Sequence, residues 1–186
     1  MDKIGISRND MLKYFEEINS RLAKDEKEAE ILITGGAALT LAFGVRDSTY
    51  DIDAIVYPEK YMENLIADIA DDYDLHADWL NDGVKIFITD EMNFNEYLKY
   101  SNLIVSVIDA ESLLAMKLTS ARDNSKDMDD SIFLMKVLGI QKEAELFEII
   151  KKYTRASLQT IESKFFTTEA FERYMQEQDV EKPSGS

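Results

Sequence analysis

One order of local patterns constrains the fold more than any other: a strand, two glycines, a short helix and a second strand. The stretch "ILIT" at residues 31–34 predicts a short buried strand that ends at the glycine pair 35–36. "AALTLAFG" contains helix-forming residues and ends at Gly44, a typical helix stop. "DIDAIVYP" at 51–58 predicts a second strand, on which alternate side chains face opposite sides.

The remaining patterns predict a mixed sheet followed by helices. An amphipathic helix is predicted over residues 8–24, capped by Asn9 or Asp10, and another follows the second strand. "GVKIFIT" and "LIVSVID" predict two further strands, and only helical patterns come after them. We therefore expect an α+β nucleotidyltransferase-type fold class, a mixed β-sheet with flanking helices and a helical C-terminal part. The expected parts are 1–110 (α/β core with the N-terminal helix), 111–180 (helical part packed on the core) and 181–186 (disordered tail).

Composition excludes several classes of protein. The chain has 186 residues, a formal net charge of −16 and no cysteine, so disulfides and thiolate zinc sites are excluded. Its acidity disfavours a general nucleic-acid binder, which needs clustered lysine and arginine. No apolar run is long enough to cross a bilayer, and the first residues lack the apolar core of a signal peptide. We expect a cytoplasmic protein without a membrane partner.

Two aspartates are the first candidates for chemistry. Asp51 and Asp53 lie at i and i+2 on the second strand, so their side chains share one face, roughly 6–7 Å apart at the backbone. Such a pair suits Mg²⁺ (or Mn²⁺), which takes oxygen ligands and substrate phosphates. The alternative is a solvated pair on an edge strand. Charges next to the buried run "AIV" favour pairing or metal binding.

The glycine pair has two interpretations. Gly35 and Gly36 stand where a strand turns into a helix, and glycine allows the backbone to approach a phosphate closely. The other interpretation is a tight turn that needs positive φ. The glycine pair together with the following DxD strand is more specific than either motif alone.

The segment "GGAALTLAFGVRDSTYDIDAIV" resembles the signature of the DNA polymerase β-type nucleotidyltransferase superfamily. It is most similar to the branch with the AbiEii-type abortive-infection toxins, which carries R-x-[ST]-x-D-[IL]-D. That arrangement is matched by Arg46, Ser48 or Thr49, Asp51 and Asp53. A later block of the same branch is matched by Lys117, Arg122, and Lys126-Asp127 with Asp130.

The resemblance implies a role for each matched residue. Gly35 and Gly36, with Arg46, Ser48 and Thr49, would bind the nucleotide. Asp51 and Asp53 would be catalytic and hold the metal. Lys117 would be catalytic and meet the triphosphate, and Asp127 would orient a basic group or help the acceptor. An NTP would be the substrate.

The sequence leaves several of these roles open. Active superfamily members often add a third carboxylate, and only Asp90, Asp109 or Asp127 offers itself here. Lys117 has the alternative of a surface lysine whose stem lies on apolar residues. His76 is expected at a domain surface, and Trp79 is expected to be a packing residue.

The expected function is a Mg²⁺-dependent nucleotidyltransferase that moves an NMP from an NTP to an unknown acceptor. The acceptor is expected to be tRNA or another RNA, a protein, or a small molecule such as an aminoglycoside, whose charge suits an acidic surface. The resemblance also suggests the toxin of a toxin–antitoxin or phage-defence pair, with a cognate antitoxin as partner. The alternative is a catalytically inactive nucleotidyltransferase-fold module that binds or regulates.

Overall fold

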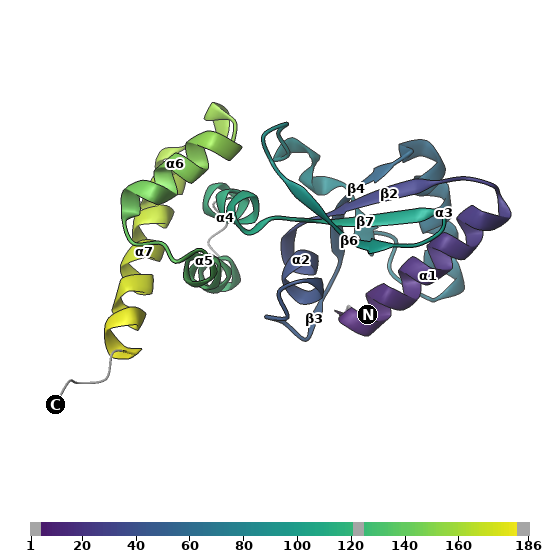
Figure 1. Ribbon diagram of the computed structural model, residues 1–186, viewed down its shortest axis with the longest axis horizontal. Coiled ribbons are helices and arrows are strands. Elements are labelled where there is room, and N and C mark those ends of the chain that lie inside the picture. Colours follow the sequence, from purple (N-terminus) through teal and green to yellow (C-terminus); the bar gives the residue numbers. More distant parts are fainter. Residues whose placement is uncertain (1–4, 121–124, 182–186) are drawn as a thin grey trace. The chain divides into compact units, whose positions relative to one another are not determined.

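The computed structural model describes residues 5–120 and 125–181, and its chain divides into two units (Figure 1). The first unit comprises Met1–Ile86 and Phe94–Ile108, and the second comprises Phe87–Asn93 and Asp109–Ser186. Arg122 and residues 182–186 of the predicted tail lie outside the described residues. Within residues 5–120 and 125–181, no helix is long and apolar enough to span a membrane.

The first unit is built on a five-stranded mixed sheet of order β5-β4-β2-β7-β6. β2 pairs antiparallel with β4 and parallel with β7, and β6 closes one edge antiparallel to β7. A separate two-stranded ribbon joins β1 to β3. The strands are β1 (Ile6–Ser7), β2 (Ala29–Ile33), β3 (Ser48–Thr49), β4 (Ile52–Tyr57), β5 (Leu80–Asn81), β6 (Phe94–Lys99) and β7 (Leu103–Ile108).

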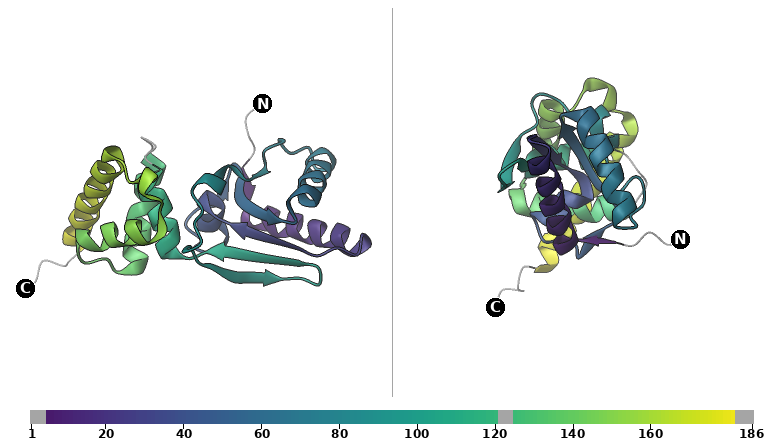
Figure 2. Two further views of the ribbon diagram at one scale, coloured as in Figure 1. Left: turned by 90° about the horizontal axis from the view of Figure 1, so that it is seen from above. Right: turned by 90° about the vertical axis from the view of Figure 1, so that its right-hand side faces the viewer.

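One face of this sheet is buried under helices α1 (Arg8–Lys24) and α3 (Glu59–Asp72), which pack side by side (Figure 2). The buried side chains are Ala29, Ile31 and Ile33 of β2, Ala54 and Val56 of β4, and Leu103, Val105 and Val107 of β7. The other face is only partly covered: Leu32 is half-buried and Tyr57 is exposed. Because side chains alternate along β4, Asp53 belongs to this more open face.

The start of α1 differs from the prediction. Ser7, not Asn9 or Asp10, is the N-cap, and its hydroxyl accepts a hydrogen bond from the backbone N–H of Asp10. Asp10 completes a capping box by accepting from the Ser7 backbone N–H and hydroxyl. These bonds lower the pKa of the Asp10 carboxyl below its ordinary value.

The strand predicted in "GVKIFIT" is wrong. The 3₁₀ helix η1 (Gly83–Ile86) stands there, with Val84 buried and Ile86 exposed. β6, one of the two edge strands of the sheet, lies further along the chain and was not predicted. Its side chains are half-buried or exposed, so it carries no alternating apolar signal.

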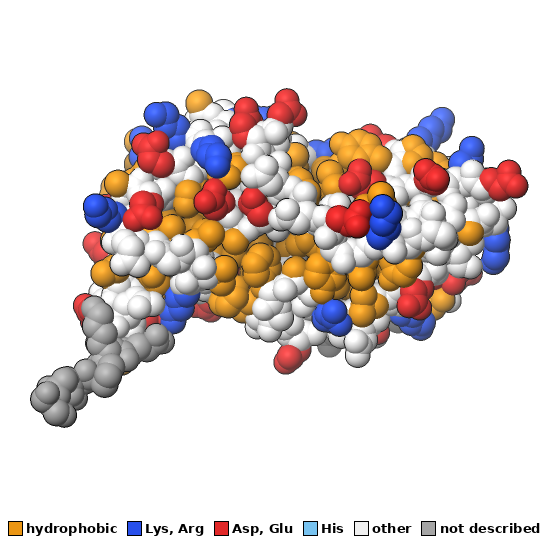
Figure 3. All heavy atoms as spheres, in the orientation of Figure 1, with side chains coloured by type: hydrophobic (Ala, Val, Ile, Leu, Met, Phe, Trp, Pro, Cys, Tyr) orange, Lys and Arg blue, Asp and Glu red, His pale blue; other side chains and the backbone are white. Residues whose placement is uncertain are grey.

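In the part of the chain that is described, the regular secondary structure of the second unit is entirely helical. On the face that Figure 3 shows, acidic side chains are scattered over both units rather than gathered in one place, as expected of solvated carboxylates. The remaining helices are α2 (Gly35–Leu41) in the first unit and α4 (Ala110–Thr119), α5 (Ser125–Leu138), α6 (Glu143–Tyr153), η2 (Ala156–Leu158) and α7 (Ile161–Glu181) in the second.

Candidate functional site

Hydrogen bonds between β2 and β4 bring the DxD strand to the glycine pair. Ile33 lies opposite Ala54 in the antiparallel register, so the next residue, Thr34, lies beside Asp53. The Thr34 backbone N–H donates to the Asp53 carbonyl at 2.9 Å, and the Thr34 hydroxyl donates to the same oxygen at 3.2 Å. Thr34 is fully buried, so this connection is shielded from water. The turn into α2 is therefore fixed to the backbone that carries the acids.

The Asp53 carboxylate packs directly against Gly35. An added Cβ at Gly35 would lie 2.6 Å from Asp53 Oδ2 and 3.3 Å from Asp53 Cβ. Gly35 also has a φ of 59°, in the left-handed region that glycine adopts most readily. Gly35 thus meets two requirements at once: the backbone conformation of the turn and room for the carboxylate.

Gly36 is faced by two further predicted residues. An added Cβ there would lie 2.9 Å from Thr49 Oγ1 and 3.5 Å from an Arg46 guanidinium nitrogen. A guanidinium and a hydroxyl at a glycine backbone are groups that bind phosphate oxygens. Ser48 is not part of this cluster, because its hydroxyl faces Gly5 in the β1–β3 ribbon.

The segment 76–81 supports the acids from the side of β5. The His76 Nε2 lies 2.8 Å from the Tyr50 carbonyl, and the Ile52 backbone N–H donates to the Trp79 carbonyl at 2.7 Å. Trp79 is fully buried, and its indole N–H donates to the Ile66 carbonyl at 3.1 Å. Asp51 is therefore flanked by two anchored residues. Trp79 packs as predicted, whereas the role of His76 in holding the loop was not anticipated.

The donor set fits a hard divalent cation. Asp51 and Asp53 are both half-buried, and they supply oxygen ligands only, as Mg²⁺ requires. Within the described residues, no group of three or more His, Cys, Asp or Glu side chains could hold a metal ion. Mg²⁺ is usually bound through one or two carboxylates plus substrate phosphates, so a pair is sufficient when the nucleotide completes the shell.

The candidates for a third carboxylate have other positions. Asp109 is the N-cap of α4 and accepts from the Ser112 backbone N–H at 2.7 Å. Asp90 belongs to the segment Phe87–Asn93 of the second unit. Asp109 is thus already used to satisfy a helix end.

Lys117 and Asp127 form a buried ion cluster in the second unit. The Lys117 ammonium lies 2.6 Å from Asp127 Oδ1 and 2.8 Å from Asp130 Oδ2. The side chains are 13%, 10% and 3% exposed, respectively, so Lys117 is not a surface lysine. Its positive charge is matched by two carboxylates from the first turns of α5. That Lys117 contacts a triphosphate stays a prediction.

Replacing Gly35 with alanine tests the packing of the acid on the turn. The positive φ alone is expected to cost about 1 kcal/mol of unfolding free energy, and the new methyl group must displace the Asp53 carboxylate. Gly44→Ala is the matched control, because Gly44 has a φ of 64° and open space where the Cβ would stand. We expect both variants to lose stability in chemical denaturation, with the larger loss in Gly35→Ala because its methyl group also displaces the carboxylate. Metal-dependent nucleotide binding, measured by calorimetry, should be lost in Gly35→Ala alone; equal binding by both variants would contradict the geometry.

Comparison with protein families gives one match that covers most of the chain. The family described as nucleotidyltransferase of unknown function (DUF6036) matches residues 9–178. This range includes the glycine pair, the DxD strand and the Lys117 cluster. Comparisons with curated proteins and with solved structures give no match, and the AbiEii-type branch stays a prediction. The chain belongs to this family of nucleotidyltransferases of unknown function.

Proposed function

We propose that this protein transfers a nucleoside monophosphate from an NTP to an acceptor in a Mg²⁺-dependent reaction. The observation that carries the proposal is the packing of the Asp53 carboxylate on Gly35, with Thr49 and Arg46 at Gly36. Candidate cation ligands and phosphate-binding groups thereby lie beside the turn from β2 into α2. Asp53 belongs to the face of β4 opposite the one covered by α3.

The carboxylates, the glycines and the arginine of this cluster have different tasks in the proposed reaction. Asp51 and Asp53 would hold Mg²⁺ at the triphosphate, where the cation would supply positive charge to neutralise the phosphate oxygens. Gly35 and Gly36 allow the triphosphate to approach the backbone closely. The Arg46 guanidinium donates hydrogen bonds to phosphate oxygens.

Transfer forms one bond and breaks another at the α-phosphorus. An acceptor oxygen attacks that phosphorus, the bond to the bridging oxygen breaks, and pyrophosphate leaves with the bonding electrons. The acceptor proton passes to a carboxylate of the pair or to solvent. Such chemistry depends on positioning and charge neutralisation rather than on a covalent enzyme intermediate, which suits a site made of carboxylates and backbone.

Binding without turnover is the second candidate function. The observation that favours it is the absence of a third metal-ligating side chain beside the pair in the described ranges. In that case the same cluster binds an NTP and Mg²⁺ and serves as a regulatory module. The two candidates differ only in whether a nucleotide is incorporated.

Labelled nucleotides test the proposal directly. Purified protein is incubated with each α-³²P-labelled NTP and Mg²⁺, in parallel with total RNA, with a protein extract and with an aminoglycoside. We expect label in one acceptor class, complete dependence on Mg²⁺, and no label after chelation with EDTA. Label in RNA or protein would fit the proposed toxin role, for which growth arrest on expression is the cellular readout. NTP binding by calorimetry with no labelled acceptor would favour the regulatory module, and no binding of any NTP would exclude both.

A further inference from the structure

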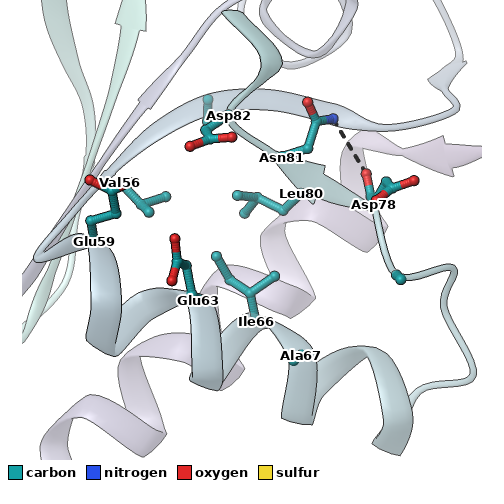
Figure 4. Close-up of a pocket in the computed structure, with 11 residues that line it drawn as sticks. Val56, Glu59, Glu63, Ile66, Ala67, Asp78, Leu80, Asn81 and Asp82 are labelled. Atoms are coloured by element: carbon teal, nitrogen blue, oxygen red, sulfur yellow. Dashed lines mark hydrogen bonds between the residues drawn. The ribbon is translucent and has the colours of Figure 1, made fainter. Parts of the chain in front are cut away.

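A cavity of about 240 Å³ opens between α3 and the edge strand β5 (Figure 4). Apolar side chains, chiefly Val56, Ile66 and Leu80, line its floor. Ala54 and Val56 line it from β4, and side-chain alternation puts them on the opposite face of that strand from Asp53. The cavity is therefore distinct from the proposed nucleotide site.

Carboxylates surround the opening of this cavity. Glu59 and Glu63 come from α3, and Asp82 follows β5. Figure 4 shows Glu63 and Asp82 on opposite sides of the space between Val56 and Leu80. An apolar floor below an acidic opening is complementary to a group with an aliphatic stem and a cationic end.

The chain itself already places one cation at this opening. The Lys85 ammonium pairs with Glu59 and lies 2.5 Å from Asp82 Oδ2. Hydrogen bonds to Asp82 and Glu59 raise the pKa of Lys85 above its ordinary value. Glu63 has no ion-pair partner in the described part of the chain. Asp78 also lines the cavity, so four carboxylates against one ammonium leave it negatively charged.

We propose that this cavity receives an arginine side chain from a basic partner protein. Its volume is below the roughly 300 Å³ at which pockets for drug-sized ligands begin, so it suits one long side chain. We favour arginine over lysine because its planar guanidinium presents several N–H donors in a fork, which suits a site with more than one carboxylate. A second copy of this chain is a poor partner, since two molecules of net charge −16 repel each other. A basic partner is attracted to the same field.

Methyl NMR of the full chain tests the proposal with an arginine peptide. The probe is a blocked five-residue peptide with one central arginine between glycines, and no nucleotide is present. We expect saturable shifts of the Val56, Ile66 and Leu80 methyl groups, which weaken as salt is added. The same peptide with citrulline, which has a similar shape but no charge, should bind about fivefold more weakly. Equal binding of the two peptides, or no shift with arginine, would overturn the proposal.

Two variants and one further ligand complete the test. Glu63→Gln should weaken the affinity for the arginine peptide about fivefold. Asp71→Asn changes an exposed residue of the same helix that does not line the cavity, so it should leave that affinity unchanged. Equal weakening by both variants would mean that only the overall charge attracts the peptide. Spermidine binding more tightly than the peptide would assign the cavity to a small polyamine instead. Neither variant touches the acid pair, so these outcomes are independent of whether the protein transfers nucleotides.

Discussion

Replacement of Asp53 with asparagine is expected to lower nucleotidyl transfer on the order of 10³-fold. The side chain keeps its shape and its packing on Gly35 but loses the charge that we propose holds Mg²⁺ against the triphosphate. Because the loss falls on the bound metal–nucleotide complex, kcat should fall more than KM rises. Single-turnover transfer of labelled nucleotide, at saturating NTP and several Mg²⁺ concentrations, measures the effect. Asp51→Asn should behave similarly.

The control is Asp71→Asn, which makes the same chemical change at an exposed position of α3. It should transfer nucleotide as the unmodified protein does, and both variants should unfold at the same denaturant concentration. Transfer by Asp53→Asn at the unmodified rate would refute the assignment of the acid pair. NTP binding without transfer by the unmodified protein and by Asp71→Asn, with weaker NTP binding by Asp53→Asn, would instead support the regulatory module.

Part of this site was predictable, because strand alternation and glycine turns depend on residues that are close together in the sequence. Alternation along β4 places Asp53 on the face opposite Ala54, and a glycine pair after a strand predicts a turn. Asp51 immediately precedes β4, so the shared face of the two acids stays a prediction. The sequence did not determine which hydroxyl of Ser48 and Thr49 meets the turn. That choice depends on the β1–β3 ribbon, where Ser48 faces Gly5. Two residues of strand carry too little pattern to be recognised.

The errors have a common physical origin, which is long-range context. β6 is an edge strand with little buried surface, so its sequence resembles a loop. The apolar residues of "GVKIFIT" resemble a strand, yet Lys85 is held by Glu59 and Asp82 in a 3₁₀ turn. His76 is a lone histidine whose partner is a backbone carbonyl 26 residues away. Such contacts leave no mark in a single sequence.

Lys117→Met is expected to produce the largest loss of stability. It removes the ammonium that lies 2.6 Å from Asp127 Oδ1 and 2.8 Å from Asp130 Oδ2, whose side chains are 10% and 3% exposed. Breaking a buried ion pair by removing one partner costs about 3–5 kcal/mol, because a buried charge loses an ion-pair partner. Since Lys117 is in α4 and its partners are in α5, the helical unit should unfold at lower denaturant concentration. Urea unfolding followed by circular dichroism measures the shift.

The triple variant Lys117→Met, Asp127→Leu, Asp130→Leu separates the structural role of the cluster from a catalytic one. Replacing a whole buried ion cluster by apolar side chains is often neutral for stability, so most of the lost free energy should return. If the cluster only joins α4 to α5, nucleotidyl transfer should return with it. If Lys117 also meets the triphosphate, as the resemblance implies, the triple variant should be stable but should bind NTP weakly. Continued instability of the triple variant would show instead that the charges themselves are required for folding.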